Sequence, residues 1–584
     1  MATENIPLFL HLHIPADFVE KYMIIIIVLG REKMMVSNAF AFVCYIIAFS
    51  TIVISSLSSS TEEVCVADID NNEQNFPCSV YLARSTIPNG GFGLFAGVPI
   101  PRGRPVGPPD IAVHLIDLPT DEDNFALRNL HEKYAASSHV TGGQFEGNQV
   151  HALLPGIGMV ANGLAKDFNV IPYRPDVNEA DVARTTSPGT GAISHYFNMS
   201  YFSFQDIRVG EEFFVKFTED STSLPKDKSK NRSKDIKWLK NHGICLDKIR
   251  QGKSSIKNLG RGAFATRYIG KGEIITSSPL LMFDDKSVFN MEHKTKLKKV
   301  TSEQLLVNYC FGHVHSSVLL YPYGPVVNFI NHDSQSPNAE IRWSTVFNED
   351  ESSRMLHEIQ FEDVSELSPT SLTIDYVALR PIKAGEEIFI DYGSAWENSW
   401  KQHVQTWSPP PNAELYSPSY VMDEVVYKIR TLEEQQIHPY PENIVTACFY
   451  RYSDAVNSSQ PVQKKNSDGK KVVTTIKWKA TRGIFNFDYL RPCTIISRVD
   501  NIILKQDSEP QSLYTVLIKN RKSLPENEKV PKGAKHIVTH IPRYALRFVD
   551  KPYTTDQTLE GSFRNPIGMP EGMFPKMWLN LMHN

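Results

Sequence analysis

The first strong hydrophobic feature of the chain is an uncharged apolar run from Val36 to Leu57. Its length is sufficient for one helical crossing of a bilayer. Arg31 and Lys33 precede the run and Glu62 follows it, and this charge bias predicts a cytoplasmic N-terminus. The run is typical of a cleaved signal peptide or of an uncleaved membrane anchor, and a buried core helix is the third interpretation.

Residues 1–60 are therefore assigned to a leader, and this assignment decides the predicted compartment. With the leader, the chain is expected in a membrane or in the secretory pathway, with residues 36–57 as the membrane attachment if they are not cleaved. If the leader is an artefact of gene prediction, the protein is expected in the cytoplasm or nucleus. A true start at Met34 or Met35 would make the first 33 residues such an artefact.

After the leader, two blocks of alternating apolar and polar residues occur twice in the same order. The block at 90–106 (GGFGLFAGVPIPRGRPV) recurs at 259–275 (LGRGAFATRYIGKGEII), and the block at 207–217 (IRVGEEFFVKF) recurs at 382–392 (IKAGEEIFIDY). Each block combines a glycine turn with a short alternating strand. The chain is therefore predicted to contain two copies of one β-rich module, at residues 78–220 and 245–400.

The remaining segments differ from this module. Residues 221–244 are rich in Lys and Arg and are interpreted as a solvated basic linker. Residues 412–584 contain short strands separated by polar turns, which is typical of a small barrel of SH3 or Tudor type. Its aromatic residues are expected in the core, with a cage for methylated lysine as the alternative; they are Trp478, Phe487 and Tyr489. The tail from Phe563 to Trp578 is predicted to fold back onto the body.

Composition limits the classes of function. At 584 residues the chain is too long for one core, and about two to four folded units are expected. The net charge of -4 provides no overall attraction to nucleic acid, so no direct nucleic-acid site is predicted. Seven cysteines without a C-x2-C pair predict no metal site, and in an oxidising compartment Cys65 and Cys78 would close a short loop.

Residues suited to binding a polar ligand occur in the second copy. An apolar strand that begins at Val326 ends in Asn331 and His332, and a polar turn through Pro337 and Asn338 follows. An amide and an imidazole at the end of a buried strand are able to hydrogen-bond a ligand, although such a pair is more often a turn cap. This pair alone does not specify a reaction.

Three motifs follow one another between Asn258 and Gly393. They are G-x-G, N-H-x4-P-N and G-E-E-x3-D-Y-G, and in this order they resemble the SET-domain family of S-adenosylmethionine-dependent protein lysine methyltransferases. The resemblance implies that S-adenosylmethionine is the cofactor and that a protein lysine is the substrate. It assigns the methyl donor to five residues: Gly260, Arg261 and Gly262 at the methionine part, and Asn331 and His332 at the amino and adenine ends.

The resemblance also assigns the reacting end of the site. Tyr392 would be the catalytic tyrosine that lines the lysine channel, because a phenol orients an amine without being a strong base. Tyr309 is a candidate second aromatic wall or an ordinary core tyrosine. The zinc-bound C-x-C-x4-C lid of some family members is absent from the sequence after Gly393, and Trp396 and Trp400 are candidate aromatic substitutes over the donor.

The first copy has lost the chemically active groups of these motifs. It has Asn162 and Gly163 at the Asn-His position and Phe217 at the tyrosine position, which is typical of a degenerate structural copy. The predicted fold is α+β, mainly β, with two SET-like modules of pseudoknotted β-sheets, a C-terminal β-rich region and an N-terminal hydrophobic helix. The predicted function is methyl transfer from S-adenosylmethionine to a protein lysine. The alternatives are a non-catalytic SET-fold scaffold and a secreted or membrane-tethered interaction protein.

Overall fold

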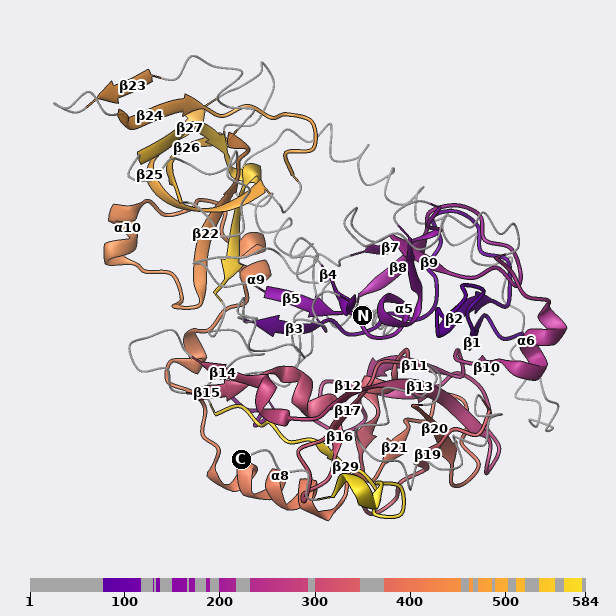
Figure 1. Ribbon diagram of the computed structural model, residues 1–584. Helices are drawn as coiled ribbons and strands as arrows, with labels where there is room; N and C mark the ends of the chain where they lie inside the picture. The colour runs from indigo at the N-terminus through magenta and orange to yellow at the C-terminus, as the bar shows by residue number, and fades with distance from the viewer. Residues whose placement is uncertain are drawn as a thin grey trace, which may run out of the picture. The chain divides into compact units, whose positions relative to one another are not determined.

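The computed structural model describes most of the chain after residue 76 (Figure 1). The described residues are 77–116, 130, 133–136, 150–164, 167–173, 185–189, 199–216, 232–292, 300–346, 372–452, 462–465, 471–485, 489–502, 511–519, 535–551 and 561–579. The predicted leader and its apolar run at 36–57 lie outside the described residues, as do Cys65 and Phe217. Among the helices that are described, none is long and apolar enough to cross a membrane.

The region predicted as the first copy consists of three small sheets. Their strand orders are β10 (Ile244–Cys245), β1 (Val80–Arg84), β2 (Phe92–Ala96); β3 (Val113–Ile116), β5 (Val150–Leu153), β4 (Ala135–Ala136); and β6 (Asn162–Leu164), β9 (Phe214–Lys216), β7 (Val170–Tyr173), β8 (Ser200–Ser203). A short helix, α5 (Ile157–Val160), precedes β6. Apolar side chains from these strands and from α5 share one buried core, in which Leu82 and Phe213 are fully buried.

Part of the predicted basic linker is folded. Residues Ile236–His242 form helix α6, whose first turn is capped by Asp235: its Oδ1 accepts a hydrogen bond from the backbone N–H of Lys237 at 2.8 Å. Leu239 is fully buried in a cluster with residues of β1 and β2. The prediction of a solvated linker is therefore wrong for this part, because the many lysines obscure one apolar position that packs against the sheet.

The second region is built on a six-stranded sheet with β13 (Ile274–Phe283) near its centre. The strand order is β19 (Ala339–Trp343), β20 (Thr373–Ala378), β13, β17 (Leu319–Pro322), β16 (Phe311–Gly312), β29 (Ile567–Gly568). Short strand pairs lie beside it: β11 (Ile249–Lys253) with β12 (Arg261–Ala265), β14 (Asn290–Glu292) with β15 (Val300–Glu303), and β18 (Asn331–His332) with β21 (Phe389–Ile390). The 3₁₀ turns η1 (Lys286–Phe289), η2 (Leu305–Tyr309) and η3 (Val327–Phe329) and helix α8 (Ser394–Thr406) complete the region.

The C-terminal tail folds back onto the body, as predicted, and belongs to this second region. Strand β29 of the tail pairs in parallel with β16, so that Ile567 lies opposite Phe311. Trp578, in the 3₁₀ turn η10 (Lys576–Trp578), is completely buried in the core that β13 and β17 share. The tail thus contributes both a strand and a core anchor to residues more than two hundred positions earlier in the chain.

Residues 444–550 form a seven-stranded sheet. Its order is β23 (Val462–Lys465), β24 (Lys471–Lys477), β27 (Lys535–Pro542), β26 (Gln511–Ile518), β25 (Leu490–Ile502), β22 (Ile444–Phe449), β28 (Leu546–Asp550), with α9 (Ser419–Val425), α10 (Leu432–Ile437), η5 (Ala413–Leu415) and η8 (Arg543–Ala545) nearby in sequence. The sheet curves strongly at β25, β26 and β27 (Figure 1). A small barrel-like region was predicted here, and the described strands form one curved sheet whose order begins at β23 and ends at β28.

The aromatic residues proposed for a methyl-lysine cage do not form one among the described residues. Trp478 is buried in the core of the sheet, and its Nε1 donates a hydrogen bond to the carbonyl of Phe449 at 2.8 Å. The ring of Tyr489 is covered by the guanidinium of Arg451 at 3.9 Å. Phe487 lies outside the described residues. The interpretation of core packing is confirmed for Trp478.

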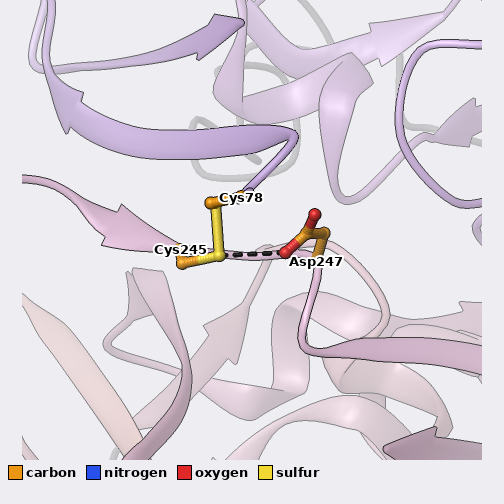
Figure 2. Close-up of side chains that lie close together, drawn as sticks. All are labelled: Cys78, Cys245 and Asp247. Atoms are coloured by element: carbon orange, nitrogen blue, oxygen red, sulfur yellow. Dashed lines mark hydrogen bonds between the residues drawn. A yellow bond between two sulfur atoms is a disulfide. The ribbon is translucent and has the colours of Figure 1, made fainter. Parts of the chain in front are cut away.

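A disulfide joins the start of the first region to the start of the second (Figure 2). It links Cys78 to Cys245, whose Cα atoms are 5.8 Å apart. The predicted pairing of Cys65 with Cys78 is therefore wrong, because the pairing of β1 with β10 brings Cys245 beside Cys78. Asp247 Oδ1 lies 2.9 Å from Cys245 Sγ, but a bonded cysteine pair has no thiolate to offer a metal ion.

Loss of this disulfide is expected to destabilise the protein, because the bond cross-links residues 167 positions apart. Cys78→Ser should lower the free energy of unfolding by about 2–4 kcal/mol. Urea denaturation under oxidising conditions measures this difference. A reducing agent should lower the midpoint of the wild type and leave that of the variant unchanged; equal midpoints for the two proteins before reduction would contradict the expected contribution.

Candidate active site

The three sequence motifs meet because of one parallel strand pair. Strand β18, which carries Asn331 and His332, pairs with β21 of the third motif. The first motif joins them from β12, since the N–H of Ile388 donates to the carbonyl of Ala263 at 2.7 Å. Segments that are far apart in the sequence therefore place their polar residues at one position in the fold.

The buried carboxylate of Glu387 connects these segments. It is 4% exposed and accepts hydrogen bonds from Ser254 Oγ at 2.8 Å, from the N–H of Ser255 at 2.7 Å and from Asn331 Nδ2 at 3.0 Å. Asn331 Nδ2 also donates to the carbonyl of Arg261 at 2.9 Å. Neutral donors from one turn and from strand β18 thus satisfy a charge that would be costly to bury alone.

Both outer positions of the G-x-G motif require glycine for a structural reason. Gly260 has φ +81°, a left-handed conformation that favours glycine. At Gly262 a Cβ atom would lie 2.0 Å from Glu387 Oε1, so a side chain does not fit unless the carboxylate moves. These two residues shape the turn, and Arg261 between them is the member of the motif that contacts the cavity described below.

The predicted first copy contains the same hydrogen-bond network. Glu212 accepts from Ser85 Oγ at 2.6 Å, from the N–H of Thr86 at 2.8 Å and from Asn162 Nδ2 at 3.2 Å. A Cβ at Gly93 would lie 2.3 Å from Glu212 Oε1. A network present in both regions is part of the scaffold, so the residues that differ between the regions are the candidates for chemistry.

His332 is one of these differing residues, and its ring is held by the backbone of the third motif. His332 Nδ1 accepts a hydrogen bond from the N–H of Tyr392 at 3.0 Å. In the neutral imidazole the proton is therefore on Nε2. The His332 ring lies 5.2 Å from that of Tyr392 and 5.0 Å from that of Trp396. The imidazole thus anchors the backbone of Tyr392 and contacts both aromatic rings.

An aromatic cluster extends from this point along α8 and consists of His332, Tyr392, Trp396, Trp400 and Phe563. Trp396 and Trp400 are one helical turn apart on α8, with ring centroids separated by 5.9 Å. Phe563 of the C-terminal tail packs edge-on against both, at 5.5 and 5.0 Å. The tail therefore closes a side of the site for which the sequence offers no zinc-binding cysteines.

A cavity of about 160 Å³ lies beside the aromatic cluster. Five of the predicted site residues line it, and they are Arg261, Tyr309, Asn331, Tyr392 and Trp396. Trp400 also lines the cavity. Gly260, Gly262 and His332 are not among its lining residues; they act through the turn and the ring contacts described above. The structure therefore brings Arg261, Asn331 and Trp396 of the predicted donor residues to the same cavity as both predicted tyrosines.

The contributors to the cavity wall that sequence reasoning missed include Asn328, Ser187 and Phe563. Both amide atoms of Asn328 are buried and have no hydrogen-bond partner within the described part of the chain. Such an orphaned amide beside a cavity is suited to a polar ligand. The sequence does not indicate this role of Asn328, because Asn328 stands two residues after Val326 in a segment that is otherwise apolar.

The tyrosines of the cavity remain neutral phenols at physiological pH. Burial raises the pKa of Tyr392, of Tyr309 and of Tyr376 above the usual value for tyrosine. The hydroxyl of Tyr392 donates its proton to the carbonyl of Ile330. A buried phenol of this kind is able to donate or accept hydrogen bonds, but it does not ionise to act as a base near pH 7.

Residues 260–393 match the family model of the SET domain. The chain contains a SET domain. The match includes the three motifs, and it ends at Gly393, directly before α8. SET-domain methyltransferases use S-adenosylmethionine as their cofactor. No curated protein sequence matches the chain.

Parts of this chain are also similar to solved structures. A Plasmodium falciparum protein described as a histone methyltransferase is 25% identical over 26% of this chain and 96% of its own, with a TM-score of 0.16. The polycomb repressive complex 2 of Chaetomium thermophilum is 23% identical over 25% of this chain and 15% of its own, with a TM-score of 0.17. This chain thus spans about a seventh of the polycomb chain. At these TM-scores the structural matches add no argument to the family match.

Proposed function

We propose that this protein is an S-adenosylmethionine-dependent protein lysine methyltransferase, and that the cavity of the SET domain is its active site. The observation that carries the proposal is the convergence of Arg261, Asn331 and Tyr392, one from each motif, on a single cavity. A second buried tyrosine, Tyr309, stands on the same cavity. The substrate is proposed to be a lysine side chain of another protein.

The described residues fit the methyl donor. Arg261 and Asn331 line the cavity from the first two motifs, and the unpartnered amide of Asn328 offers a further polar contact. Trp396 and Trp400 present apolar rings of the size that an adenine base packs against. Arg261, Asn331 and the tryptophans would therefore hold the donor, with His332 orienting the rings.

When bound, S-adenosylmethionine supplies an electrophilic methyl group that a neutral amine accepts. The amine must lose its proton before it reacts, and a cavity that excludes water favours the neutral form. The hydroxyl of Tyr392 and the carbonyl of Ile330 are oriented by their mutual hydrogen bond. They are proposed to align the lysine nitrogen, with Tyr309 as the opposite wall.

The predicted first copy is proposed to be a structural duplicate without a donor site. Its Glu212 network and its parallel pairing of β6 with β9 match the arrangement around Glu387 and the pairing of β18 with β21. Gly163 replaces the histidine that orients the aromatic rings. The scaffold is therefore retained, while the groups that would contact the donor are missing.

Methyl transfer to lysine tests this proposal. The full chain is incubated with S-adenosylmethionine that carries a labelled methyl group and with a mixture of lysine-rich proteins, and mass spectrometry identifies labelled residues. Labelled methyl-lysine in the wild type is expected. Donor binding without any labelled lysine over a broad protein set would favour the alternative of a non-catalytic SET-fold scaffold.

A further inference from the structure

Asp110, in the predicted first copy, carries a buried carboxyl group that contacts the SET domain. It is 3% exposed, and its Oδ2 accepts a hydrogen bond from the N–H of Val326 at 2.7 Å. Its Oδ1 accepts from the N–H of Ile111 at 2.9 Å. Backbone amides therefore hold this carboxyl group in place, and no cation of the described residues is paired with it.

The bond from Val326 holds an unusual backbone conformation. Val326 has φ +66° and ψ -16°, the left-handed region that a β-branched residue rarely adopts. Such a conformation costs roughly 1–3 kcal/mol and persists only where the surroundings enforce it. Gly156 leaves room for the carboxylate, since a Cβ there would lie 2.5 Å from Asp110 Oδ2. Asp110 is thus fixed in the position from which it holds Val326.

Val326 is also the start of the segment that forms a wall of the cavity. The five residues that follow it, 327–331, all line the cavity, and so does Ile111, the other partner of Asp110. Within this segment the carbonyl of Ile330 accepts the hydroxyl proton of Tyr392. A change at Val326 therefore moves the backbone that carries Asn331 and positions Tyr392.

We propose that Asp110 is a positioning residue for the methyl-donor site: its carboxyl group fixes the left-handed turn at Val326 and thereby the placement of Asn331 on the cavity wall. The predicted first copy then has a defined task, because it supplies a contact that the SET domain does not contain. This inference rests on the proposed function, and its test separates the failure of one from the failure of the other.

Asp110→Asn tests the role directly. An amide accepts hydrogen bonds only at its oxygen, so either Val326 or Ile111 loses its acceptor. The dissociation constant for S-adenosylmethionine, measured calorimetrically on the full chain, is expected to rise about tenfold. The matched control is Asp206→Asn, which alters an exposed aspartate of the same region that accepts from the N–H of Arg102 and should leave the affinity unchanged.

The outcomes of this titration are distinct. A wild-type affinity in folded Asp110→Asn, with the folded state shown by its melting temperature, would overturn the positioning role. An absence of donor binding in the wild type would overturn the proposed function instead. A tenfold loss in Asp206→Asn as well would show that the effect is not specific to the contact with Val326.

Val326→Gly separates positioning from general packing. Glycine adopts a left-handed φ without strain, so the turn no longer depends on the carboxylate. In the Val326→Gly background, Asp110→Asn is therefore expected to raise the dissociation constant by less than about threefold. A tenfold rise that persists in this background would contradict a role through Val326. If the glycine variant does not fold, the comparison of Asp110→Asn with Asp206→Asn decides the proposal.

A pH dependence accompanies this contact. Burial raises the pKa of Asp110 to about 8, and Tyr201 and Tyr321, whose own pKa values are also raised, are the titratable groups that interact with it. Between about pH 4, the pKa of an unfolded aspartate, and the folded value, only the folded protein keeps the proton. Stability from this group therefore falls as pH rises through that window. Urea unfolding should show a smaller fall in Asp110→Asn; an equal fall in both proteins would contradict the assignment.

Discussion

Tyr392→Phe is expected to retain S-adenosylmethionine binding and to lose methyl transfer by about 100-fold. The substitution removes the hydroxyl that donates to the carbonyl of Ile330 and leaves the ring in contact with His332 and Trp396. The aromatic cluster therefore stays packed while the lysine nitrogen loses its alignment. The measurement pairs calorimetric titration of the donor with the rate of label transfer to lysine.

A matched control for this substitution is Tyr427→Phe. Tyr427 is 84% exposed, so the loss of its hydroxyl should change neither the donor affinity nor the rate. If Tyr392→Phe transferred methyl groups at the wild-type rate, the role given to Tyr392 would be wrong. If it lost donor binding instead, Tyr392 would have to be reassigned as a binding residue.

Gly262→Ala is expected to remove donor binding and to lower the free energy of unfolding by about 1–3 kcal/mol. The added Cβ would lie 2.0 Å from Glu387 Oε1, inside the network that also holds Asn331. The carboxylate would have to move and would leave buried donors without partners. Chemical denaturation measures the stability, and calorimetric titration measures the affinity.

Two other glycines give the controls. Gly572→Ala places a Cβ where no atom lies within 4 Å, so stability and affinity should both be unchanged. Gly93→Ala repeats the same clash in the predicted first copy, against Glu212 Oε1 at 2.3 Å. It should lower stability by a similar amount while the folded protein still binds the donor. A loss of binding in Gly572→Ala would show that the assay does not report on the site.

The local part of the site was predictable from the sequence. The glycine turns, the short strands and the Asn-His pair are each set by neighbouring residues, and their fixed order restricts how they can meet. The parallel pairing of β18 with β21 then brings Asn331 and Tyr392 to the same cavity. The predicted internal repeat adds information, because Asn162 and Asn331 make equivalent hydrogen bonds while only the second of the two regions has His332.

The contacts between distant segments were not predictable in the same way. The pairing of Cys78 with Cys245, the hydrogen bond from Val326 to Asp110 and the packing of Phe563 on α8 each join residues more than 150 positions apart. No local pattern of hydrophobicity specifies such a partner. Burial of the tail was expected from its apolar residues, but the face that it covers depends on the finished fold.

The comparison of the two regions also changes the meaning of one predicted residue. Asn331 was assigned to the donor, yet its Nδ2 donates hydrogen bonds to Glu387 and to the carbonyl of Arg261. In the first region, Asn162 Nδ2 makes the corresponding bonds to Glu212 and to the carbonyl of Phe92. Its amide is therefore first a structural connector. The SET domain differs from the first region in the residues around this connector. These residues are His332 and the aromatic side chains that it contacts.

The most direct test of the account is a calorimetric titration of the full chain with S-adenosylmethionine. The account predicts saturable binding of one molecule per chain, retained in Gly93→Ala and Tyr392→Phe and absent in Gly262→Ala. An absence of binding to the correctly folded wild type, or binding that survives Gly262→Ala, would contradict the assignment of the cavity in the SET domain as the active site.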